Sequence, residues 1–152
     1  MARVIPEGSA SELMAVMEAE HRRLRALLAG KDAGTFAERP NGKWSVIENL
    51  RHLLFTEQAL GRFTPGGVSW SPLGYPPPGL WKHRRFSAFQ FEANPTVEEV
   101  LAEWDTASAA IRASLTRDDA EIRLALGKNV RHLRGHIRQI ASASRAASRP
   151  KV

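Results

Sequence analysis

Four long segments of the chain repeat apolar residues at the spacing of an amphipathic helix. The clearest is the third, where apolar residues recur every three or four positions from Val97 to Leu115. Three of the segments open with Ser9, Ser45 or Thr96, each followed three positions later by a glutamate, which is the pattern of a helix capping box. No segment carries the pattern of a β-strand. The sequence therefore predicts an all-α fold, most simply a four-helix bundle.

The predicted helices span about residues 9–30, 45–62, 96–116 and 128–148 of a single domain, 1–152, that ends in a basic tail, 145–152. Residues 31–44 and 117–128 are predicted connections, the latter with a short helical turn around 118–124.

Between the second and third predicted helices, residues 63–95 are too rich in proline and glycine for a helix. This crossover loop is long enough to run the length of a bundle, so the two helices it joins could be parallel. Its aromatic residues, among them Trp70, Tyr75 and Trp81, indicate a loop that packs against the bundle.

Composition excludes several classes of site. The 152 residues include no cysteine, which removes disulfides, thiolate metal sites, iron–sulfur clusters and a cysteine nucleophile. No apolar run is long enough to cross a bilayer, and the N-terminal residues lack the apolar core of a signal peptide, so we expect a cytoplasmic protein without a membrane partner. The formal charge of +6 suits nucleic-acid binding, but no nucleic-acid-binding motif accompanies it. A basic surface with a basic tail explains the charge more simply.

Two histidines, His132 and His136, lie four residues apart in the fourth predicted helix, so their side chains share one face. They flank the apolar stripe of that helix, and His52 lies off the solvent face of the second predicted helix. Three imidazoles from two facing helices can hold a divalent ion and leave one coordination position open. Taken alone, each histidine could instead be a buried, hydrogen-bonded side chain that binds no metal. Helices also place two histidines four residues apart by chance.

Three further residues are candidates for supporting such a site or for contacting a substrate. His21 lies at the edge of the apolar stripe of the first predicted helix. It could be a further ligand or a group that supports the site, but we favour a residue of the core. Glu48 precedes His52 by one turn and could orient its ring, although the capping box explains Glu48 as well. Gln139 lies beside the histidine pair. No catalytic residue can be named, because the chain contains no nucleophile elbow, phosphate loop or HExxH motif.

Two segments resemble the signatures of the DinB-like superfamily of small metal-binding four-helix bundles. Residues 44–53 resemble its second-helix signature, in which a tryptophan and a serine open the helix and a histidine follows eight residues after the tryptophan. Residues 132–140 resemble its fourth-helix signature, in which two histidines are separated by three residues and followed by Gln-Ile. Ile137 departs from the pattern, since many members carry a further histidine there that is not one of the three ligands.

The resemblance implies a bundle, frequently homodimeric, in which His52, His132 and His136 hold a divalent ion, often zinc or nickel. Some relatives are thiol S-transferases that use mycothiol, bacillithiol or glutathione. We therefore expect a metal-dependent thiol S-transferase that acts on an electrophilic small molecule. Two alternatives stay open. Metal-activated water would make the site that of a hydrolase, and a non-enzymatic, stress-related metal-binding bundle would act through dimerisation.

Overall fold

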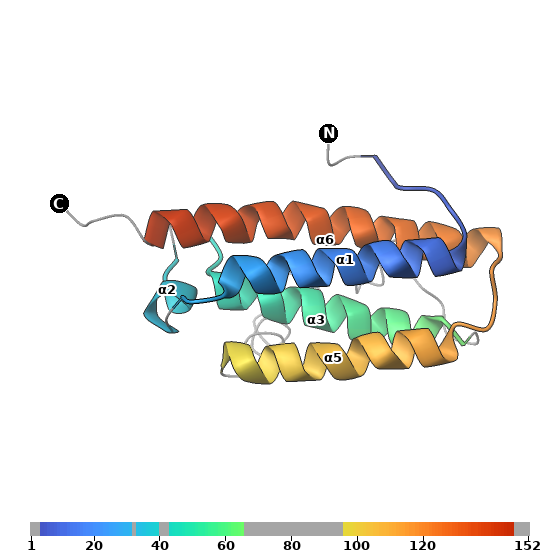
Figure 1. Cartoon of the computed structure of the whole chain (residues 1–152), viewed down its shortest axis with the longest axis horizontal. Coiled ribbons are helices and arrows are strands. Elements are labelled where there is room, and N and C mark those ends of the chain that lie inside the picture. Colours follow the sequence, from blue (N-terminus) through green and yellow to red (C-terminus); the bar gives the residue numbers. More distant parts are fainter. Residues whose placement is uncertain (1–3, 32, 40–42, 66–95, 148–152) are drawn as a thin grey trace, which may run out of the picture.

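The computed structural model describes residues 4–31, 33–39, 43–65 and 96–147, which form five helices and no strand (Figure 1). The long helices are α1 (Ala10–Leu28), α3 (Val46–Phe63), α5 (Val97–Ser114) and α6 (Ala120–Ala147), and the short helix α2 (Ala33–Ala37) lies between α1 and α3. The predicted all-α fold is confirmed. The predicted crossover loop from residue 66 to 95 and the end of the basic tail from residue 148 lie outside the described residues.

Three of the long helices begin where the sequence predicts, because each starts with a hydroxyl cap. Ser9, Ser45 and Thr96 each accept a hydrogen bond from the backbone N–H three residues later. At Ser45 the capping box is complete, since the Glu48 carboxylate accepts the Ser45 backbone N–H at 3.0 Å. α1 ends just before Gly30, whose φ of 77° suits glycine and stops the helix.

The fourth long helix begins much earlier than predicted, at Ala120 rather than near residue 128. Asp119 caps it by accepting the Ile122 backbone N–H at 2.9 Å, and the buried Ile122 and Leu126 continue its apolar stripe. Gly127 stands inside this helix because the N-terminal segment crosses there: a Cβ at Gly127 would lie 2.7 Å from the Pro6 carbonyl oxygen. The prediction of a connection over residues 117–128 is therefore wrong from residue 120 onward.

The segment 31–44, also predicted to be a connection, contains the helix α2. Phe36 of α2 is buried in a core cluster to which all four long helices contribute, so tertiary packing stabilises a helix too short to form alone.

The long helices surround the core in the cyclic order α1, α6, α3, α5 (Figure 1). α1 and α6 run in one direction and α3 and α5 in the other, so the two helices joined by the crossover are parallel. The seams α3–α5, α1–α6 and α3–α6 are closely packed, whereas α1 and α5 approach each other less closely. Within the described ranges, no helix has the length and apolar character needed to traverse a bilayer.

Candidate metal centre

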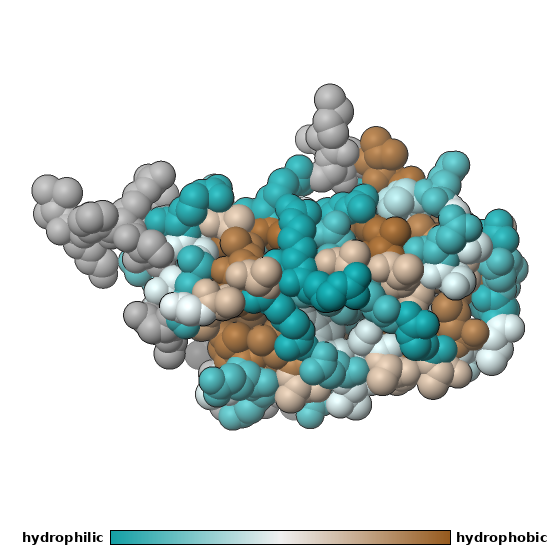
Figure 2. All heavy atoms as spheres, in the orientation of Figure 1, coloured by the Kyte–Doolittle hydropathy of each residue, from teal (hydrophilic) through white to brown (hydrophobic). Residues whose placement is uncertain are grey.

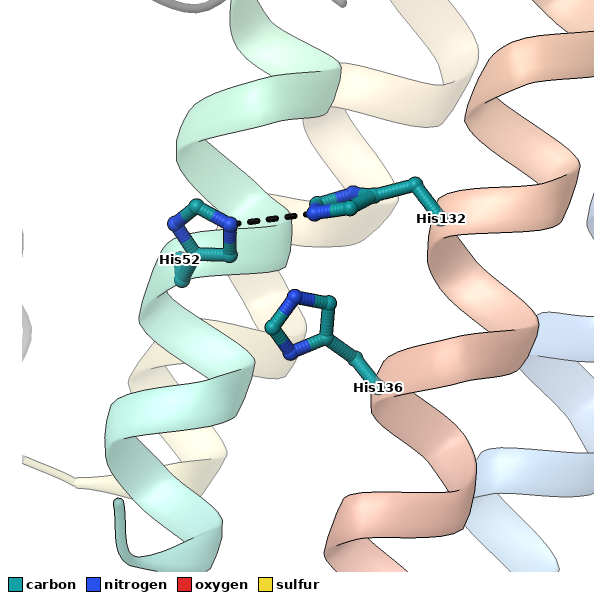
Figure 3. Close-up of side chains that lie close together, drawn as sticks. All are labelled: His52, His132 and His136. Carbon is teal, nitrogen blue, oxygen red and sulfur yellow. Dashed lines mark hydrogen bonds between the residues drawn. The ribbon is translucent and has the colours of Figure 1, made fainter. Parts of the chain in front are cut away.

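His52, His132 and His136 meet between α3 and α6 (Figure 3). The Nε2 atoms of His52 and His132 lie 3.1 Å apart, and all three candidate ligand nitrogens lie within 4.8 Å of one another. His52 is buried, and the other two side chains are half-buried. The close packing of α3 against α6 thus brings together residues that are 80 positions apart in the sequence.

The cluster fits one divalent ion. Nitrogen ligands at about 2.1 Å from a tetrahedral zinc ion lie about 3.4 Å from one another. The observed separations, 3.1 Å between two Nε2 atoms and at most 4.8 Å within the cluster, are close to this spacing. Three imidazole ligands suit zinc, nickel or a neighbouring transition metal rather than magnesium or calcium, and they leave a coordination position open.

Burial keeps two of these histidines neutral. It lowers the pKa of His132 to about 2, and the charges that His136 and His52 carry when protonated contribute to the same shift. Burial also lowers the pKa of His136 to about 4. Since only the neutral ring offers a lone pair, both residues are in the metal-binding protonation state at neutral pH.

Asn49, buried one turn before His52 on α3, determines which nitrogen of His136 faces the cluster. The Asn49 amide nitrogen donates to the Ser45 carbonyl oxygen at 2.9 Å, so the amide oxygen is the atom that lies 2.7 Å from His136 Nδ1. His136 Nδ1 must therefore donate, which leaves the lone pair on Nε2. Figure 3 shows that this second nitrogen points toward His52 and His132.

Asn49 has one signal in the sequence that could have identified it. It is a polar residue on the apolar side of its helix, and a buried amide there needs a partner.

The Trp44 side chain packs beside the cluster. Its indole lies edge-on to the His52 ring, with centroids 5.1 Å apart, and stacks near the His136 ring at 6.1 Å. The residue that precedes the α3 cap thus packs against the site.

Two of the three predicted supporting residues have other partners, and the third is exposed. His21 on α1 hydrogen-bonds to Glu57, with Nε2 2.8 Å from one carboxylate oxygen. Glu48 completes the α3 cap and pairs with Arg39 through two hydrogen bonds of 2.7 and 2.6 Å. Gln139 is exposed on α6. A role for these residues in metal or substrate binding stays a prediction.

Replacing Asn49 with leucine is expected to weaken zinc binding by about 10- to 100-fold, the usual cost of losing a partner that orients a ligand histidine. His136 would lose the acceptor for Nδ1, and its other tautomer would turn an N–H toward the cluster. Competition against a chromophoric chelator measures the affinity. Asn49→Asp is the matched control, because it keeps an oxygen acceptor and should retain binding. Equal zinc affinity for Asn49→Leu and the wild type would contradict the assigned role.

The family model described as the DinB superfamily matches residues 16–140 of the 152-residue chain. The match includes all three histidines of the cluster. No curated protein and no solved structure is significantly similar to the chain.

Proposed function

The chain belongs to the DinB superfamily, and from this premise we propose that it is a divalent-metal-dependent enzyme that transfers a low-molecular-weight thiol to an electrophilic small molecule. The observation that carries the proposal is the cluster of His52, His132 and His136, which is compatible with one ion and supplies one ligand fewer than a tetrahedral ion accepts. Zinc and nickel are the ions proposed, because imidazole nitrogen suits both.

The residues of the chain have separate parts in this proposal. The three histidines hold the ion through their lone pairs, Asn49 orients His136, and Trp44 packs beside the rings of His52 and His136. When bound, such an ion supplies Lewis acidity, which lowers the pKa of a thiol in the open position and favours the nucleophilic thiolate. Because the chain has no cysteine, the sulfur nucleophile must come from a free thiol.

A thiol panel tests the proposal. Protein purified without a histidine tag is loaded with zinc or nickel and incubated with a halogenated electrophile and mycothiol, bacillithiol or glutathione. We expect a thioether product whose rate depends on one of the thiols and on the ion. His136→Ala is the control for the ion, since it removes one ligand. Rates equal to the uncatalysed reaction with all three thiols would reject transferase activity.

The same experiment separates the two alternatives. Substrate cleavage in the arm without thiol would identify a hydrolase, since an open position accepts water as readily as a thiol. Stoichiometric metal without turnover in any arm, together with a homodimer in light scattering, would favour a metal-binding bundle that acts through dimerisation in a stress response.

A further inference from the structure

The seam between α1 and α5 lies across the bundle from the histidine cluster and contains a groove of about 370 Å³. His21 of α1 and Ser108 and Ala109 of α5 contribute to its lining. The short side chains of Ser108 and Ala109 leave the middle of the seam unfilled, which is consistent with the looser approach of these two helices.

Two ion pairs frame this groove. Arg25 pairs with Asp105 at 2.5 Å, and Arg112 pairs with Glu18. The two pairs are seven residues apart along each helix, or about 10 Å at 1.5 Å per residue. Figure 2 shows hydrophilic side chains that cross from α1 to α5 on this face. The ion pairs connect the helices at two levels and leave the space between them open.

His21 lies between these two levels and is held from beneath by a buried carboxylate. Its Nε2 is 2.8 and 3.0 Å from the two carboxylate oxygens of Glu57, a residue that is only 1% exposed. One side of the His21 ring lies against Trp104, with centroids 4.3 Å apart. Because Glu57 engages Nε2, Nδ1 is the nitrogen of His21 that remains for a ligand in the groove.

The charges along the seam leave a surplus cation beside His21. The two carboxylates that line the groove each have a cationic partner, since Glu18 pairs with Arg112 and Asp105 with Arg25. Arg22 also lines the groove, and in the part of the chain that the structure describes it has no acidic partner. A ligand that enters the groove therefore meets a guanidinium that is not neutralised.

We propose that the α1–α5 groove is a second binding site, for a small oxyanion of the carboxylate or phosphate class. When an oxyanion binds, Nδ1 of His21 donates its N–H while Nε2 shares a proton with the buried Glu57, and Arg22 supplies charge-assisted hydrogen bonds. The Ser108 hydroxyl, half-buried in the lining, is a further donor. The proposal involves none of the cluster histidines and is independent of the proposed transferase activity.

Histidine side-chain NMR on the zinc-loaded full chain tests the groove, with inorganic phosphate and acetate as separate probes. We expect a saturable shift of the His21 signals with at least one probe. Arg22→Gln should weaken that binding about tenfold or more, the usual effect of losing a charge-assisted hydrogen bond. The stronger probe identifies the class of oxyanion.

Arg23→Gln is the matched control, because the neighbouring Arg23 pairs with Glu20 and does not line the groove. It should leave both affinities unchanged. Arg22 and Arg23 are both exposed, so neither substitution should disturb the fold. Any of three results would overturn the proposal. The NMR shifts could be confined to His52, His132 and His136, they could fail to saturate, or both variants could lose the same amount of affinity for the probe.

Discussion

Replacing His52 with alanine is expected to lower the affinity for zinc or nickel by more than about a hundredfold, so that the variant purifies without stoichiometric metal. Loss of a residue that only orients a ligand costs 10- to 100-fold, and loss of a ligand itself costs more. His52 is the one cluster histidine on α3, and without it the ion would keep two ligands from a single helix, His132 and His136.

Elemental analysis of tag-free protein measures this loss, and chelator competition gives the change in affinity. Trp44 offers a second readout, because its indole lies 5.1 Å from the His52 ring and should report nickel binding through fluorescence quenching. Arg138→Ala is the control, since Arg138 is exposed on α6. A His52→Ala protein that still binds one ion with wild-type affinity would reject the three-histidine site and, with it, the metal chemistry proposed above.

The helices were predictable where local signals decide them. The caps at Ser9, Ser45 and Thr96 are set by side chain and backbone within one turn, so their helices begin where the sequence predicts. Helix α2 was missed because its stability comes from burying Phe36 against distant residues. The start of α6 was misplaced because the contact that explains Gly127 inside the helix is a distant one: a Cβ there would collide with the N-terminal segment at Pro6.

The meeting of the three histidines was predictable for a related reason. The spacing of His132 and His136 places them on one face, and the apolar stripe of each helix indicates which side faces its neighbour. The partners of other polar residues depend on how the helices pack. Asn49 hydrogen-bonds to His136, 87 positions away in the sequence, and His21 hydrogen-bonds to Glu57, 36 positions away. No local sequence pattern encodes either pairing.

The metal-free protein is expected to lose stability steeply as the pH falls from about 6.5 toward 4. In the unfolded chain a histidine has a pKa of about 6.5. In the folded protein burial lowers the pKa of His136 to about 4 and that of His132 to about 2. Below pH 6.5 the unfolded chain therefore binds protons that the folded chain does not, so acidification favours unfolding.

The size of this effect follows from the same shifts. Above the pKa of histidine in the unfolded chain, the free energy of unfolding keeps its full value. Below that pKa it falls by up to about 1.4 kcal/mol per pH unit for each histidine. For His136 the loss ends near pH 4, where the folded protein also binds the proton, and for His132 it continues toward pH 2. By pH 4 the two residues together cost up to about 6 kcal/mol, which is comparable to the whole stability of a small domain.

Denaturant unfolding at a series of pH values measures this dependence, and the exchange of single histidines isolates it. His132→Gln keeps a polar side chain but removes the titrating group, so its stability should decline less steeply between pH 6 and 4, by about 1 kcal/mol per pH unit. Carboxylates elsewhere titrate equally in both proteins and cancel in the comparison. Parallel stability curves for His132→Gln and the wild type would show that His132 takes up its proton equally in both states. The half-buried ring would then be open to water, and a bound ion would have to compete with protons at neutral pH.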